Sequence, residues 1–153
     1  MKPISQRGFT LVELVVVIAI LAVLAAVAAP RFFTLQGEAR KSAINGLRGA
    51  VSSAAVMSNA LQTAQGLSGG ASITVEGNTI AMLNGWPNSL LGTGLAAVIQ
   101  FDANAFATSG GSPMTFQVRS ASTPANCSFT YTNAVAGPPQ VPALISTPVT
   151  TGC

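Results

Sequence analysis

One carboxylate near the N-terminus lies where a carboxylate is energetically costly. Glu13 is followed by sixteen consecutive apolar residues, from Leu14 to Ala29. A charged side chain near the edge of an apolar span costs on the order of 2–3 kcal/mol on membrane-insertion scales. Ionisable residues in such places are functional candidates, and each calls for a partner of opposite charge. The sequence therefore singles out Glu13 as a residue that does more than anchor the chain.

A cation four residues before Glu13 would arise if the chain were cut after Gly8. Residues 1–8 are short, polar and basic. Cleavage between Gly8 and Phe9 would free the α-amine of Phe9, which Glu13 of a neighbouring copy could reach in a helical assembly. A buried ion pair of this kind gives registry more than net stability. If the leader, residues 1–8, is removed, the spacing predicts an assembly contact at Glu13.

The cysteines offer a second piece of chemistry. Cys127 and Cys153 are the two cysteines of the chain, and they form no Cys-x-x-Cys pair. An even count in an exported, loop-rich region predicts one disulfide. Closing a loop of this size is worth about 3.5 kcal/mol in the chain-entropy model. We expect the bond to tie the proline-rich C-terminal loop, 127–153, back to the last clear strand.

The sequence lacks the residues that catalysis, metal binding and nucleic-acid binding usually require. The chain has no histidine and four acidic side chains, which are far apart in the sequence. This composition excludes histidine-based metal sites and most acid–base catalysis, and no Gly-x-Ser-x-Gly elbow occurs. No basic stripe interleaves with aromatic residues, as nucleic-acid binding would favour. We therefore expect no catalytic residues, no cofactor, no metal and no nucleic-acid contact.

The element that must position Glu13 is an apolar helix. Phe9 to Ala29 is 21 residues, about 31 Å as a helix, which matches the hydrocarbon core of a bilayer. Lys2 and Arg7 precede the segment, so the positive-inside rule places them in the cytoplasm. We predict a transmembrane helix over 9–30. Other interpretations are a secretory signal, since Ala26-Val27-Ala28 resembles a signal peptidase site, a plain single-pass anchor and a buried core helix.

A second helical pattern follows a predicted break at Pro30, where the proline lacks an N–H and clashes with the preceding turn. Apolar residues then recur at three- and four-residue steps, and the pattern fades near Gly66, a candidate C-cap. We predict an amphipathic helix over 31–66 that packs on the chain's own head. Its expected apolar stripe is Phe33, Ile44, Leu47, Val51, Ala54 and Leu61.

Residues 67–153 predict a small β-rich head. The fold class is therefore α+β: a long N-terminal helix, transmembrane in its first half and amphipathic in its second, packed on a small antiparallel sheet with a disulfide-bounded C-terminal region. Residues 95–101 fit either a short helix or a buried strand. The expected strands are 73–75 and 79–82 around a turn at 76–78, then 114–119 and 127–131.

The segment from Arg7 to Leu14, Arg-Gly-Phe-Thr-Leu-Val-Glu-Leu, resembles the class III signal of type IV pilins and pseudopilins. The resemblance implies cleavage between Gly8 and Phe9 by a prepilin peptidase and methylation of the Phe9 amine. It implies that Glu13 is the acidic residue used in subunit recruitment, and Pro30 falls where pilins carry a helix-breaking proline. The partners it implies are an inner-membrane assembly platform and further copies of the chain, as a homo-oligomeric helical filament.

Three stretches of the head, Gly85-Trp86-Pro87, 127–131 and 150–153, look similar to mannose-sensitive haemagglutinin-type pilins. The likeness implies a structural pilus subunit, held in the inner membrane before assembly and lying at the cell surface afterwards, that supports adhesion, surface attachment or motility. In pilins the disulfide-bounded region is exposed and used in surface contacts.

Two other functions stay open. One is a type II secretion pseudopilin, which the N-terminal motif does not distinguish from a pilin. The cysteine pair favours a pilin, and the C-terminal loops lack the acidic cluster expected of a major pseudopilin's calcium site. The other is a membrane-anchored ligand-binding module, which would show as saturable binding of a small molecule by the head.

Overall fold

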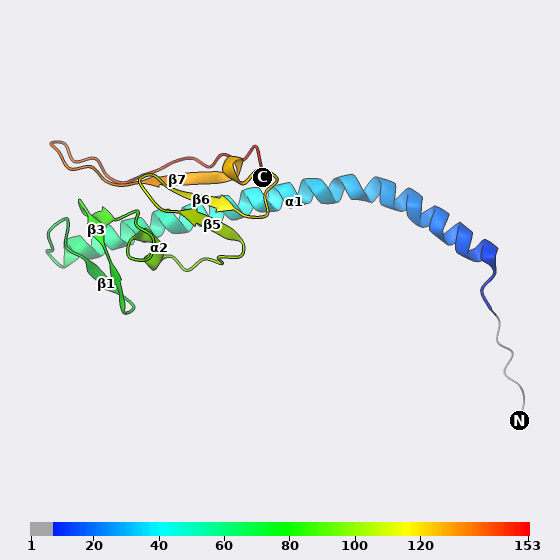
Figure 1. Ribbon diagram of the computed structural model, residues 1–153, viewed down its shortest axis with the longest axis horizontal. Coiled ribbons are helices and arrows are strands. Elements are labelled where there is room, and N and C mark those ends of the chain that lie inside the picture. Colours follow the sequence, from blue (N-terminus) through cyan, green and yellow to red (C-terminus); the bar gives the residue numbers. More distant parts are fainter. Residues whose placement is uncertain (1–7) are drawn as a thin grey trace, which may run out of the picture. The chain divides into compact units, whose positions relative to one another are not determined.

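The computed structural model describes residues 8–153 (Figure 1). The chain divides into two compact units, Met1–Gln36 and Gly37–Cys153. One long helix, α1 (Leu11–Ala64), contributes residues to both units, and three small antiparallel sheets belong to the second. The predicted α+β fold, with its long apolar N-terminal helix and small antiparallel sheets, is confirmed.

In the first unit, α1 is exposed along its whole length and is not broken at Pro30. Every described residue of this unit, from 8 to 36, is exposed. Pro30 lies inside α1, and Thr34 Oγ1 donates to the Pro30 carbonyl at 3.2 Å. The predicted helix break at Pro30 is therefore wrong. An interior proline removes a single backbone hydrogen bond, and the alanine-rich turn before it has high helix propensity.

In the second unit, α1 buries one face against the head. Ile44, Leu47 and Val51 are buried as predicted, whereas Ala54 and Leu61 are half-buried. Phe33, which belongs to the first unit, is 72% exposed and takes no part in this face. The complete set of buried α1 residues follows the three- and four-residue spacing of a helix face: Ile44, Leu47, Val51, Ala55, Ser58 and Gln62.

The helix ends at the predicted C-cap. Gly66 adopts a φ of 64°, which glycine reaches without steric cost. Its amide donates to Thr63 O at 3.0 Å, and the amide of Leu67 donates to Gln62 O at 3.2 Å. These two bonds form a Schellman motif, which satisfies carbonyls that the helix end would otherwise leave unpaired.

The main sheet packs on α1 and carries the core. Its strand order is β5 (Phe106–Ser109), β6 (Met114–Val118), β7 (Ser128–Thr132), β8 (Leu144–Ile145), all antiparallel. β6 and β7 run alongside α1 in Figure 1. The rings of Phe116 and Phe129, paired across these strands, stack with centroids 4.9 Å apart. The core joins them to α1 through Ile44, Leu47, Val51, Met114, Val118 and Tyr131.

Two short hairpins, a turn of α-helix and a 3-10 turn, η1 (Pro124–Asn126), complete the head. β1 (Ile73–Val75) pairs with β2 (Asn78–Ile80), and β3 (Met82–Leu83) pairs with β4 (Trp86–Pro87). The predicted first hairpin is confirmed, although its turn is two residues long. Its second strand, predicted over 79–82, is Asn78–Ile80, and Met82 belongs to β3. The segment 95–101, for which helix and strand were both open, begins with a helical turn, α2 (Leu95–Val98).

Candidate functional site

The N-terminal end of α1 holds the side chains that the sequence singled out. Gly8 and Phe9 lie before the helix, and Phe9 is 85% exposed. Glu13 Oε2 accepts hydrogen bonds from the backbone N–H and the hydroxyl of Thr10, both at 2.9 Å. The amide of Glu13 donates to Thr10 Oγ1 at 3.3 Å. Thr10 is therefore the N-cap of α1, with Glu13 at the third helical position, and the two residues form a capping box.

The capping box is a local role for Glu13 that the sequence analysis missed. Thr10-Leu11-Val12-Glu13 has the Ser/Thr-x-x-Glu spacing that defines such a box, so the signal was present. The box holds the carboxylate at the positive end of the helix dipole. Within residues 8–153 the ion pair that forms is Lys41–Glu38, and Glu13 has no cationic partner. The carboxylate is thus fixed in place and still open to a cation from outside this part of the chain.

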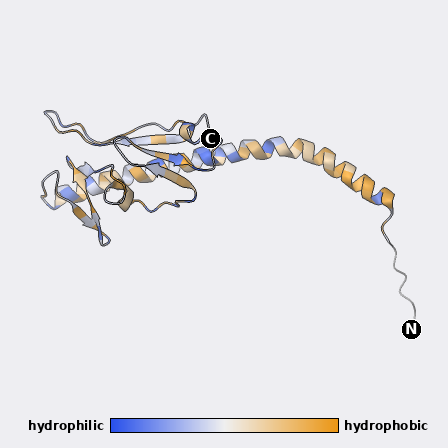
Figure 2. Cartoon of the chain, viewed as in Figure 1, coloured by the Kyte–Doolittle hydropathy of each residue, from blue (hydrophilic) through white to orange (hydrophobic). Residues whose placement is uncertain are grey.

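The helix beyond Glu13 presents an uncovered apolar surface. It is long and apolar enough to cross a membrane, and none of its apolar window is buried in the chain. Figure 2 shows the hydrophobic colouring to be continuous along this part of α1. Exposed residues include Leu14 at 59%, Leu21 at 56% and Val27 at 72%. A surface of this kind marks a segment that lipid or other protein covers.

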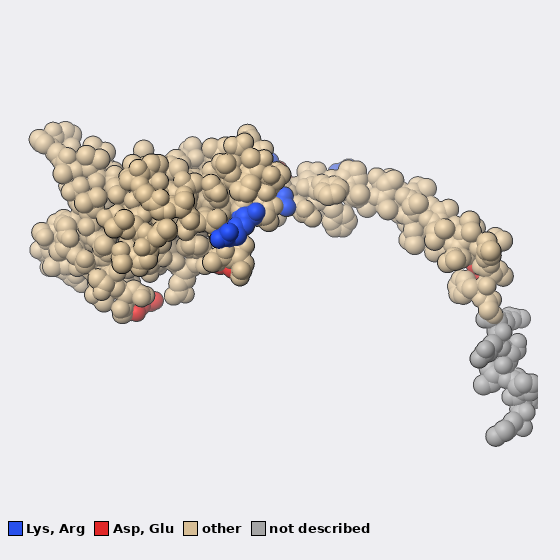
Figure 3. Space-filling view, viewed as in Figure 1, with Lys and Arg blue, Asp and Glu red and all other residues tan. Residues whose placement is uncertain are grey.

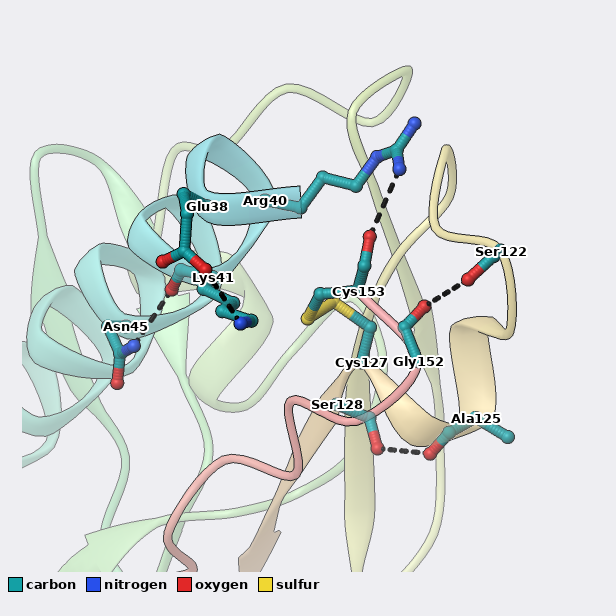
Figure 4. The surroundings of a disulfide bond; sticks show 10 residues. All are labelled: Glu38, Arg40, Lys41, Asn45, Ser122, Ala125, Cys127, Ser128, Gly152 and Cys153. Carbon is teal, nitrogen blue, oxygen red and sulfur yellow. Dashed lines mark hydrogen bonds and ion pairs between the residues drawn. A yellow bond between two sulfur atoms is a disulfide. The ribbon is translucent and has the colours of Figure 1, made fainter. Parts of the chain in front are cut away.

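The predicted disulfide closes the C-terminal region. Cys127 and Cys153 are bonded, and Cys127 is fully buried immediately before the start of β7 (Figure 4). The residue before the last cysteine, Gly152, makes three hydrogen bonds beside the disulfide. The amide of Gly152 donates to Asn126 O at 2.9 Å, and its carbonyl accepts from the Thr123 amide at 3.1 Å and the Ser122 hydroxyl at 2.8 Å. The tail end is therefore fixed by a network as well as by the disulfide.

Two arginines of α1 hold the same tail. Arg40 Nη1 donates to the Cys153 carbonyl at 3.0 Å, as Figure 4 shows. Arg48 Nε donates to the Ser146 carbonyl at 2.8 Å. Both arginines lie on the second half of α1, so the C-terminal loop is fastened to the helix as well as to β7. The region 127–153 is thus held against the rest of the head by the disulfide and by these two hydrogen bonds.

The head also contains a polar hollow of about 380 Å³ beside the C-terminal end of α1. Gln62, a buried side chain there, donates to Ser68 O and Ala71 O at 3.0 and 2.7 Å. Asn59 donates to Gly85 O at 2.6 Å. These amides therefore hold loops in place, which explains why Gln62 is buried although the sequence pattern put it off the helix stripe. The lining residues include Asn59, Gln62, Thr63, Asn84 and Gln140.

No cluster of three or more potential metal ligands occurs among residues 8–153. Of the residues predicted to act, the structure brings Cys127 and Cys153 together and places Gly8, Phe9 and Glu13 within one short segment. The rest of the predicted leader, residues 1–7, lies outside the described part of the chain.

Comparison with known families supports the N-terminal assignment. Residues 4–29 match the family described as the prokaryotic N-terminal methylation motif. The matched segment contains Gly8, Phe9 and Glu13. No curated protein and no solved structure matches the chain. The motif supports a type IV pilin or pseudopilin, a structural rather than a catalytic class, and it fits processing by a prepilin peptidase and membrane anchoring before assembly.

Proposed function

We propose that this chain is the structural subunit of a type IV pilus filament, assembled through its N-terminal helix. The observation that carries the proposal is the combination at that end: an apolar helix that the chain itself does not cover, with a carboxylate in its first turn that has no cationic partner within residues 8–153. In a single copy the apolar surface is uncovered, and the carboxylate has no cation among the described residues. A filament in which helices pack together would supply both the cover and the cation.

The apolar surface gives the order of events. Before assembly the helix over residues 9–30 lies in the inner membrane, because its length matches the hydrocarbon core and its exposed side chains are apolar. After assembly the same side chains pack against other copies as the filament core. The head, residues 67–153, then lies outside the cell, where a disulfide persists.

The processing step follows from the position of the Gly8–Phe9 bond. Both residues are exposed and precede the helix, so a peptidase can reach the bond without unwinding α1. Cleavage creates the amine of Phe9, which is then methylated. Glu13, already oriented by Thr10, accepts the amine of an adjacent subunit during recruitment by the assembly platform. The filament then supports adhesion, surface attachment or motility.

The disulfide-stapled tail favours a pilus over the secretion alternative. A filament exposed outside the cell gains from a covalent bond in its surface region, and the fixed tail at 127–153 is the part we assign to surface contacts. A secretion pseudopilin would share the N-terminal features, so the filament itself must be observed.

The deciding experiment is to shear cells that express the chain and to identify the subunits of any released filament by mass spectrometry. We expect long filaments whose subunits begin at methylated Phe9. Replacing Gly8 by a bulky residue should leave full-length precursor in the membrane. Glu13→Ala should be cleaved yet yield few filaments, whereas the control Glu38→Ala should assemble normally. Normal processing of the Gly8 variant, or normal filament yield from Glu13→Ala, would refute the corresponding role.

A further inference from the structure

One cation and one anion among residues 8–153 make neither an ion pair nor a side-chain hydrogen bond within this part of the chain. They are Arg31 and Glu76. Both are exposed. Glu38 and Lys41 pair with each other. The other charged side chains of residues 8–153 hydrogen-bond to groups of the same chain: Glu13, Arg40, Arg48, Asp102 and Arg119.

The unpaired cation lies beside uncovered apolar side chains. Phe32 and Leu35 are 64% and 63% exposed. Leu35 is four residues after Arg31 and three after Phe32, so the three side chains are neighbours on one face of α1. The face they form, which we call the Arg31 face, combines two large apolar groups with one positive charge.

The unpaired anion lies at the rim of an apolar groove. The groove measures about 470 Å³, and Glu76 is its one charged lining residue. The hydroxyl of Ser58, on its floor, already donates to Ala54 O at 2.8 Å, so it needs no further acceptor. Met57, at the edge, is 71% exposed. We call this the Glu76 groove, and its other lining residues are Ala50, Ser53, Ala54, Leu61, Val75 and Val98.

We infer that the Arg31 face of one copy docks in the Glu76 groove of a second copy, with Arg31 paired to Glu76. The two surfaces match in kind: each is apolar, and each carries one charge of opposite sign that lacks a partner among residues 8–153. The contact uses different patches on the two copies, so it is heterologous and propagates from copy to copy, as a helical filament requires. The inference rests on the proposed filament and names one of its subunit contacts.

The backbone at Glu76 adds to the case. Glu76 has a φ of 49° and Gly77 a φ of 83°, which together make the tight turn between β1 and β2. Glycine, asparagine and aspartate suit the first position of such a turn, whereas glutamate is disfavoured there. The presence of Glu76 at this position therefore supports a contact between its carboxylate and a group outside its own head.

Charge reversal in the full-length chain tests the contact. Arg31→Glu and Glu76→Arg should each lower the yield of sheared filaments at least about tenfold, since like charges would then face each other. The double variant, which restores an opposite pair between copies, should recover most of the wild-type yield. Lys41→Glu and Glu38→Arg are matched controls, because both residues pair within one chain, and each should assemble normally.

Glu76→Asn separates assembly from folding. It removes the charge and suits the turn better, so the melting temperature of the purified chain should rise while filament yield falls. Normal yield from either charge reversal, or no recovery in the double variant, would overturn the inference while leaving the proposed filament intact. Absence of filaments from the wild-type chain would instead remove the proposed function.

Cross-linking gives an independent measure. Leu35→Cys in one copy and Met57→Cys in a co-expressed second copy should form a mixed disulfide in the membrane or the filament, detected by mass spectrometry of non-reduced peptides. The control pair, Leu35→Cys with Thr74→Cys on the exposed position of β1, should not cross-link. Equal cross-linking of both pairs, or none at Met57, would contradict the docking.

Discussion

Removing the covalent link in the tail should cost the head about 3.5 kcal/mol of unfolding free energy. We propose Cys153→Ser as the perturbation. Cys127 and Cys153 are separated by 26 residues, and the chain-entropy model gives this loss for a loop of that size. Cys127 is fully buried and stays in place, so no cavity is created beside β7. The loss should therefore come from the freedom that the unfolded chain gains.

Guanidinium unfolding of the full-length chain in detergent micelles measures this loss. Trp86 is the single tryptophan and is half-buried against the core, so its fluorescence reports the head. The variant should unfold at lower denaturant with an unchanged or larger m-value, because its unfolded state is less compact. Wild-type chain with a reductant is the control and should behave like the variant. A difference in unfolding free energy below about 1 kcal/mol would show that the hydrogen bonds at Gly152 and Arg40, rather than the covalent loop closure, hold the tail in place.

Three further outcomes follow from the core. Burial raises the pKa of the Tyr131 hydroxyl. The unfolded chain therefore ionises first, so the free energy of unfolding should be unaffected below about pH 10 and should fall by about 1.4 kcal/mol per pH unit above it. Tyr131 is the sole tyrosine, so tyrosinate absorbance at the ordinary pKa in the folded state would contradict this. Gly94→Ala should destabilise the head by at least about 2 kcal/mol in thermal unfolding, because the new Cβ would lie 1.9 Å from the Asn88 carbonyl oxygen. The control Gly70→Ala places its Cβ in open space and should be near neutral. Ile44→Ala should cost about 2–5 kcal/mol in the same assay, and a loss below 1 kcal/mol would mean that the α1–sheet core is not as described.

Local signals in the sequence predicted much of the fold. The apolar run, the three- and four-residue spacing after it and the turn at Gly77 each depend on neighbours in the chain, and each is seen in α1 or the β1–β2 hairpin. The disulfide was predictable because two cysteines allow a single intramolecular pairing. Glu13 stood out for a related reason, since a carboxylate beside an apolar run conflicts with its surroundings.

Features that depend on distant parts of the chain were not predicted. Gln62 is buried because two loop carbonyls need its donors, and no helix pattern records that need. Phe106–Ser109 pairs as β5 only because β6 lies beside it, and β8 forms in a proline-rich tail because β7 supplies its partner. Pro30 shows the reverse case: a residue with a strong local preference was outweighed by the turns on either side of it.

The way the head is fastened to α1 has a mechanical consequence. The sheet lies along the helix (Figure 1). The hydrogen bonds that join α1 to the head are spread along the helix, from Arg40, which donates to Cys153, to Asn59, which donates to Gly85. A pull on the head along the helix axis would load the core and these bonds together, in shear. Few lysines and arginines lie on the face of the head seen in Figure 3. The ion pair found among residues 8–153, Lys41–Glu38, lies within α1 and does not join the helix to the head, so packing and hydrogen bonds carry the load. Added salt should therefore leave the force needed to detach the head from its helix almost unchanged.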